Sequence, residues 1–178
     1  MTALTLKSYQ QSALDALATY ARAARVKGPA AAFAEHAGRA YNADAFGPDV
    51  PCVCLRIPTG GGKTVLAAHA VPLLAAEWRG TDAPVAVWLV PSDTIRTQTL
   101  KALQTSGHPY REALEAVYGL GLRVCSLDDV AQVPAPQWGR QAVVIVVATI
   151  QSFRIDDAGQ RNVYSFTEAF EPHFKYAL

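Results

Sequence analysis

The chain has 178 residues, 51% of them apolar, which is enough for one sizeable hydrophobic core. Its 16 basic and 15 acidic side chains leave a formal charge of +1, so net charge cannot attract nucleic acid and any binding needs a local patch. The three cysteines lack zinc or redox spacing, and the sequence has neither a signal-peptide pattern nor an apolar run of the ~20 residues that span a membrane. We therefore expect a reduced, cytoplasmic, soluble protein without a membrane partner.

The first predicted element is a helix over residues 8–27, because apolar residues recur at helical spacing up to Gly28 and Pro29. The stretch that follows mixes alanines with glycine and proline, which is typical of a surface excursion containing a turn or two of helix. We expect residues 1–50 to form this helix and excursion, and residues 51–178 to form the main domain.

Later runs predict strands that are buried on both faces, because each is apolar throughout where a one-faced strand would alternate. Helical patterns lie between them, and this alternation predicts an α/β fold with a mostly parallel sheet. Pro72 is expected to kink or shorten the first of these helices. The expected strands are CVCLRI (52–57), VAVWLV (85–90), VVIVVAT (143–149) and, more weakly, RVCSL (123–127); the expected helices are 63–76, 93–104 and 110–118.

A glycine-rich stretch, PTGGGKT (58–64), joins the first expected strand to the helix after it. Glycines let backbone N–H groups and the positive end of a helix surround one anion at close range. Lys63 would then reach the β- and γ-phosphates of a nucleotide, and the Thr64 hydroxyl would bind Mg²⁺. This arrangement is the Walker A motif, or P-loop.

The match to the P-loop pattern fails at its first position, where Ile57 stands in place of a glycine. The Gly-Lys-Thr core is intact. A glycine-rich turn that binds nothing is the alternative, but the coincidence of strand, glycines, Lys-Thr and helix favours nucleotide binding.

PTGGGKT resembles motif I of superfamily 2 helicases and translocases, and LKSYQQSAL resembles their Tyr-Gln element. The second resemblance implies that Gln10 reads the adenine edge and that Tyr9 packs nearby, which suits an amide because it donates and accepts side by side. A solvent-facing glutamine at a helix start is the alternative for Gln10. The resemblance implies catalytic roles for Lys63 and Thr64, and cofactor-binding roles for Tyr9, Gln10, Thr59, Gly60, Gly61, Gly62, Lys63 and Thr64.

Two further stretches resemble the superfamily's nucleic-acid motifs. VWLVPSDTIRTQTLKAL is similar to motif Ia, where hydroxyls, amides and an arginine contact phosphates without reading bases. A helix N-cap at Ser92 and a solvated Arg96 are the alternative readings. VVIVVATIQSF is similar to motif Ib or Ic. The nucleic-acid-binding positions implied are Pro91, Ser92, Arg96, Gln98, Thr149, Gln151 and Ser152.

A Walker B strand is the other reading of VVIVVATIQSF. It fails because a strand that holds Mg²⁺ would end in an acidic residue, and this strand ends in Ala148 and Thr149. The pairs Asp128-Asp129 and Asp156-Asp157 are expected to be solvated.

Within superfamily 2, the ordered set of motifs between Leu4 and Phe174 is most similar to the restriction subunit of Type III restriction enzymes. The resemblance implies a three-layer RecA-like domain, ATP and Mg²⁺ as cofactors, and DNA as a backbone-contacted partner. It further implies a second RecA-like domain of a longer parent chain and a modification (methyltransferase) subunit. The acidic strand is expected beyond residue 178, so we expect a first RecA-like domain that is incomplete at its C-terminus and inactive alone. A P-loop NTPase or kinase unrelated to DNA, and a non-catalytic nucleotide-binding module, stay open as alternatives.

Overall fold

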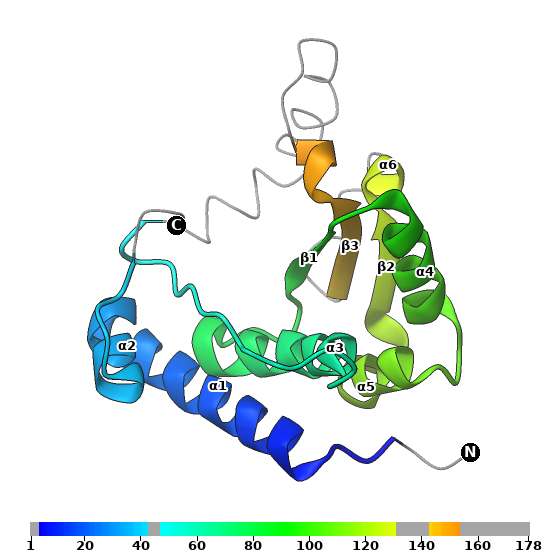
Figure 1. The fold of residues 1–178 in the computed structure, drawn as a ribbon. Coiled ribbons are helices and arrows are strands. Elements are labelled where there is room, and N and C mark those ends of the chain that lie inside the picture. Colours follow the sequence, from blue (N-terminus) through cyan, green and yellow to red (C-terminus); the bar gives the residue numbers. More distant parts are fainter. Residues whose placement is uncertain (1–3, 43–46, 131–142, 154–178) are drawn as a thin grey trace. The chain divides into compact units, whose positions relative to one another are not determined.

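The computed structural model describes residues 4–42, 47–130 and 143–153, drawn in colour in Figure 1. The chain divides into two units, Met1–Asp82 and Ala83–Leu178. The boundary expected after residue 50 therefore lies inside the first unit. The described strands all belong to the second unit.

The first unit is built on the long helix α1 (Ser8–Lys27), whose bounds confirm the predicted helix. One face of α1 is buried through Leu14, Leu17 and Ala21. It packs against α2 (Pro29–Ala37), α3 (Lys63–Leu74) and the π-helical turn η1 (Ala75–Arg79). Arg22 of α1 forms an ion pair with Glu77 of η1, with 2.7 Å between Nη2 and Oε1.

Pro72 shortens α3 as the sequence predicts. A proline inside a helix lacks the N–H that would bond four residues back, and its ring crowds that carbonyl. The regular α-helix ends two residues later at Leu74, and the chain continues in the wider turn η1. The expected helix to residue 76 is thus an α-helix that ends early and opens into a π-helix.

The strand predicted over residues 52–57 is wrong. These residues form no β-ladder in the described structure, and Val53 and Leu55 are exposed. The Tyr41 hydroxyl accepts the Cys52 N–H at 2.7 Å and donates to the Val50 carbonyl. An apolar run becomes a strand only when a neighbouring strand takes up its backbone groups, and here a side chain does so at its start.

The second unit contains a parallel sheet in the order β1 (Val85–Val90), β3 (Val143–Thr149), β2 (Leu122–Ser126). Every residue of the central strand β3 is buried, as its continuous apolar run predicts. Val90 pairs with Thr149 and Ser126 pairs with Val147, so the carboxyl ends of the three strands meet at one edge. This edge is where open α/β sheets bind their ligands.

Helices pack along this sheet. The helix α4 (Asp93–Gln104) contacts all three strands, and α5 (Pro109–Tyr118) packs against α4 and β2. Leu103 of α4 and Leu114 of α5 are fully buried. Short elements complete the unit, namely η2 (Gly119–Gly121), α6 (Leu127–Val130) and η4 (Ile150–Phe153).

The edge strand β1 differs from its prediction in burial. Val87 and Leu89 are 38% and 50% exposed, so β1 is not buried on both faces. In the part of the chain that the structure describes, no helix combines the length and apolar character that crossing a bilayer requires.

Candidate functional site

The phosphate-loop candidate connects residues 52–57 to α3 in the first unit. Gly61 N–H donates to the Pro58 carbonyl at 3.0 Å and closes a turn at Thr59 and Gly60. Gly62 is the N-cap of α3 and has a φ of +79°. The helix therefore starts at Lys63, and its first N–H groups lie beside the loop, where an anion is favoured.

Two of the loop glycines are required by space. A Cβ on Gly61 would lie 2.6 Å from Ile57 Cγ2 and 2.9 Å from the Pro58 carbonyl oxygen. A Cβ on Gly62 would lie 2.4 Å from Gln10 Nε2, in addition to the strain of its positive φ. The bare backbone therefore lets the loop fold tightly on itself and against α1.

Lys63 and Thr64 occupy the first turn of α3. The Lys63 side chain is exposed, and its ammonium donates to the Pro58 carbonyl at 3.1 Å. Thr64 is half-buried, whereas Thr59 and Gly60 are exposed. The loop thus presents one cationic group and a helix N-terminus, which is the chemistry that a phosphate group needs.

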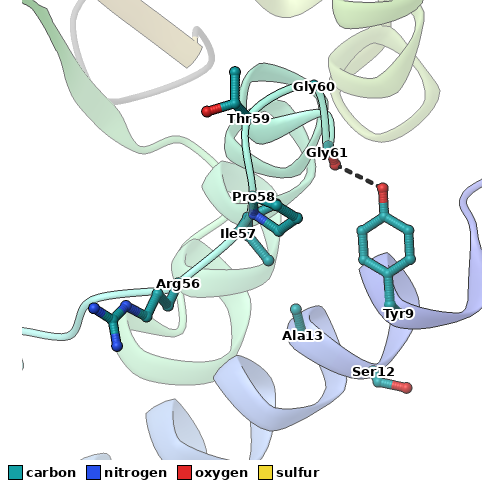
Figure 2. Close-up of a pocket in the computed structure, with 9 residues that line it drawn as sticks. All are labelled: Tyr9, Ser12, Ala13, Arg56, Ile57, Pro58, Thr59, Gly60 and Gly61. Atoms are coloured by element: carbon teal, nitrogen blue, oxygen red, sulfur yellow. Dashed lines mark hydrogen bonds between the residues drawn. The ribbon is translucent and has the colours of Figure 1, made fainter.

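Tyr9 and Gln10 come from the first turn of α1 and reach the same atom of the loop. The Tyr9 hydroxyl donates to the Gly61 carbonyl at 3.0 Å, and Gln10 Nε2 donates to it at 2.9 Å. Figure 2 shows the Tyr9 bond from helix to loop. The structure thus brings both predicted residues to the loop across about fifty residues of sequence. The adenine contact expected of Gln10 stays a prediction.

A cavity of about 730 Å³ lies beside the loop, within the range of volumes that hold small ligands (Figure 2). Five of its lining residues were not predicted as site residues, namely Ser12, Ala13, Arg56, Ile57 and Pro58. Ser12 and Ala13 follow Tyr9 by three and four positions, so helical spacing alone places them on the same face. Arg56 lies two residues before the glycine-rich stretch, and its guanidinium points away from Gly60 and Gly61 in Figure 2.

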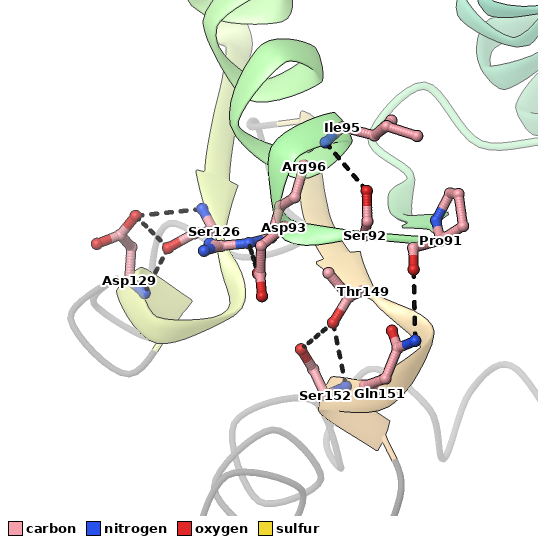
Figure 3. Close-up of polar contacts among 10 residues, drawn as sticks. All are labelled: Pro91, Ser92, Asp93, Ile95, Arg96, Ser126, Asp129, Thr149, Gln151 and Ser152. Carbon is pink, nitrogen blue, oxygen red and sulfur yellow. Dashed lines mark hydrogen bonds and ion pairs between the residues drawn. The ribbon is translucent and has the colours of Figure 1, made fainter.

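The second unit places the other predicted residues at the carboxyl edge of the sheet. Ser92 caps α4, and its hydroxyl accepts the Ile95 N–H at 3.4 Å. Gln151 Nε2 donates to the Pro91 carbonyl at 3.4 Å, which joins the loop after β3 to the loop after β1 (Figure 3). Thr149 is buried, and its hydroxyl lies 2.8 Å from that of Ser152.

Arg96 and Gln98 lie on α4 behind this edge. Arg96 Nε donates to Asp93 Oδ1 at 2.9 Å, so its guanidinium already has an anionic partner (Figure 3). Gln98 is exposed. Ser92 is the N-cap of α4, as its alternative interpretation predicts, and it also lies at the carboxyl edge of the sheet. The geometry brings Pro91, Ser92, Thr149, Gln151 and Ser152 to the carboxyl edge of the sheet, whereas Gln98 lies in the middle of α4. The contacts of all these residues to nucleic acid stay predictions.

The acidic pair after β2 is exposed, but Asp129 is not merely solvated. Its Oδ2 accepts from the Ser126 hydroxyl at 2.6 Å and from the Ser126 N–H at 3.1 Å, and the Asp129 N–H donates back to that hydroxyl. This reciprocal pattern is a capping arrangement for α6. Asp156 and Asp157 lie outside the described residues.

Comparison with known proteins identifies the family of the chain. No curated protein and no solved structure matched the chain. A family model described as "Type III restriction enzyme, res subunit" matches residues 3–175, nearly the whole chain. The chain therefore belongs to the family of Type III restriction enzyme res subunits, whose matched region is a RecA-like, ATP-dependent helicase-type motor domain of superfamily 2.

Proposed function

We propose that the chain is the ATP-binding part of a DNA helicase or translocase in a system of the Type III restriction-modification kind. The observation that carries this proposal is the phosphate loop, in which three glycines, an exposed lysine and the start of α3 converge. Family membership supports a helicase-like motor, and such a motor would bind ATP at this loop.

The loop residues fit a magnesium nucleotide. Gly60 and Gly62 would offer backbone N–H groups, whereas the Gly61 N–H is already bonded to the Pro58 carbonyl. A Cβ on Gly61 would collide with Ile57 and Pro58, so the loop can fold this tightly only with a glycine there. Lys63 would exchange its bond to the Pro58 carbonyl for the β- and γ-phosphates. Thr64 would be the protein's ligand to Mg²⁺, with phosphate oxygens and water as the other ligands that this ion prefers.

The polar carboxyl edge of the sheet supports DNA as the second ligand. Ser92, Gln151 and Ser152 are polar groups within one small region, and Arg96 stands behind them. Hydroxyls, amides and an arginine suit phosphate oxygens and carry no base code. We propose sequence-independent contacts to the DNA backbone, with a second RecA-like domain and a methyltransferase subunit as protein partners.

Fluorescence anisotropy with labelled DNA of two unrelated sequences, at 50 and 200 mM salt, tests this proposal. We expect weak binding that ignores sequence and weakens with salt, because phosphate contacts release counterions. Arg96→Ala should lower the log–log salt slope by about 1. Asp93→Asn should strengthen binding, because it removes the carboxylate that competes for Arg96. Arg123→Ala is the control, since Arg123 is an exposed arginine near the amino-terminal end of β2.

The same assay distinguishes a DNA motor from a second class of function. A P-loop NTPase or kinase that acts on a small molecule would bind magnesium nucleotide but show no DNA binding at either salt concentration. That result would contradict the motor proposal while leaving the phosphate loop in place. Tight, sequence-selective DNA binding would contradict the backbone contacts.

A further inference from the structure

Two adjacent side chains of α1 meet at one carbonyl of the phosphate loop. The Tyr9 hydroxyl and Gln10 Nε2 lie 3.0 and 2.9 Å from the Gly61 oxygen, and both donate to it. A carbonyl oxygen has two lone pairs, so the two donors satisfy it completely. A glutamine that only reads adenine would not need this hydrogen bond to the loop.

The Gln10 amide is fixed at both ends. Its Oε1 accepts the Lys7 N–H at 2.9 Å, which caps the start of α1, while Nε2 holds Gly61. The residue is only 7% exposed. Because the oxygen serves an N–H and the nitrogen serves a carbonyl, turning the amide over would break both bonds. Little of this side chain is left to face a ligand.

The loop side of this contact is equally constrained. Gly61 N–H donates to the Pro58 carbonyl at 3.0 Å, so Gly61 is held through its N–H by the loop and through its carbonyl by α1. A Cβ on Gly62 would collide with Gln10 Nε2, which shows how closely helix and loop approach. The peptide between Gly61 and Gly62 therefore has one defined orientation.

That orientation has a consequence for phosphate binding. In a trans peptide, the carbonyl and the following N–H point in opposite directions. Since the Gly61 carbonyl points to α1, the Gly62 N–H points away from α1. An N–H beside the start of a helix is the kind of donor that binds a phosphate oxygen.

We propose that Tyr9 and Gln10 are positioning residues that hold the Gly61–Gly62 peptide in its phosphate-binding orientation, and that they act on the phosphates of any nucleotide rather than on its base. This inference rests on the proposed function. It assigns to Tyr9 a hydrogen-bonding role and to Gln10 a role that carries no preference for adenine.

Calorimetric titration of residues 1–178 with Mg-ADP, Mg-GDP and magnesium tripolyphosphate tests this inference. Tyr9→Phe deletes one hydrogen bond and keeps the ring, so all three ligands should bind roughly three- to tenfold more weakly. Gln10→Ala should weaken all three at least as much, with the ratio of Mg-ADP to Mg-GDP affinity unchanged. Gln11→Ala, whose side chain bonds Asp15 at the exposed surface, is the control and should change nothing.

Melting temperatures without ligand separate positioning from mere stability. Tyr9→Phe should lose affinity for all three ligands while it still unfolds cooperatively, with a ligand-free melting temperature lowered by only about 2–4 °C, because the deleted bond contributes about 1 kcal/mol. This variant decides alone if Gln10→Ala does not fold. Selective loss of Mg-ADP binding in Gln10→Ala would overturn the inference, because a base-reading amide affects only adenine. Unchanged affinities in Tyr9→Phe would also overturn it. If the unaltered chain binds none of the three ligands, the proposed function itself fails.

Discussion

Single residues of the phosphate loop have roles that backbone geometry explains. Gly62 combines a positive φ with a Cβ position that Gln10 already fills, so two independent constraints exclude a side chain there. Lys63 is exposed, and among the described residues its ammonium bonds to a carbonyl of its own loop, that of Pro58. A charged ligand can replace that bond at small cost, because the ammonium is solvated and flexible.

Gly62→Ala is expected to lower the affinity for Mg-ADP at least about tenfold, because the loop must shift to relieve strain of roughly 1–3 kcal/mol and the contact with Gln10. Gly38→Ala is the matched control. Gly38 has a similar positive φ of +62° and open space around its Cβ position, and it lies in α2's cap, outside the loop. Isothermal titration of both variants checks this, and equal affinities would show that the loop tolerates a side chain.

For single residues, the sequence predicts which kind of ligand a site binds better than it predicts which side chains touch each other. The residue types of the phosphate loop predict an anion site by themselves, because the order glycine, lysine, threonine at the start of a helix is typical of phosphate binding. The meeting of Tyr9 with Gly61 depends on how α1 packs, which no local pattern encodes. Arg56 was missed because an arginine before a loop has no signature until the cavity beside it is known.

Secondary-structure elements were predicted best where their pattern is local. The helices 8–27 and 93–104 and the strands 85–90 and 143–149 have the predicted bounds, since caps and periodicity mark them. The run 52–57 fails because a strand depends on a distant partner. The exposure of Val87 and Leu89 was not predicted for the same reason, because the burial of a sheet face depends on distant segments that pack against it.

The helix α5 provides a test of the core of the second unit. Leu114 is fully buried and Val117 is 61% exposed on the same helix. We expect Leu114→Ala to lower the free energy of unfolding by about 2–5 kcal/mol, because it leaves a cavity. Val117→Ala should change it by no more than about 0.5 kcal/mol. Urea titrations followed by circular dichroism measure both, and similar losses for the two variants would contradict the burial of this helix.

For the whole chain, the two candidate sites lie in different units. The phosphate loop belongs to the first unit, and the polar carboxyl edge of the sheet belongs to the second. The described strands end in Val90, Ser126 and Thr149, none of which is acidic. In the described ranges, no three His, Cys, Asp or Glu side chains gather where they could hold a metal ion.

Residues 1–178 alone are expected to release phosphate from ATP only at background rate, with or without DNA. The reaction needs an acidic group that holds Mg²⁺ and places water, and an arginine that stabilises the developing charge. Such an arginine is worth about a thousandfold or more in rate. Phosphate release from the purified chain measures this. DNA-stimulated turnover of several per second would contradict it and would mean that the chain carries a complete active site.

The central claim is that the loop from Gly60 to Thr64 binds a magnesium nucleotide, and calorimetric titration of Lys63→Ala with Mg-ADP tests it most directly. Removing a charged donor to phosphate should weaken binding by roughly ten- to a hundredfold, since such bonds contribute about 1.5–3 kcal/mol. Lys101→Ala is the control, because Lys101 is also an exposed lysine and lies on α4, outside the loop. We expect Lys101→Ala to bind like the unaltered chain and Lys63→Ala to lose most of its affinity. Equal affinities of the two variants would contradict nucleotide binding at this loop.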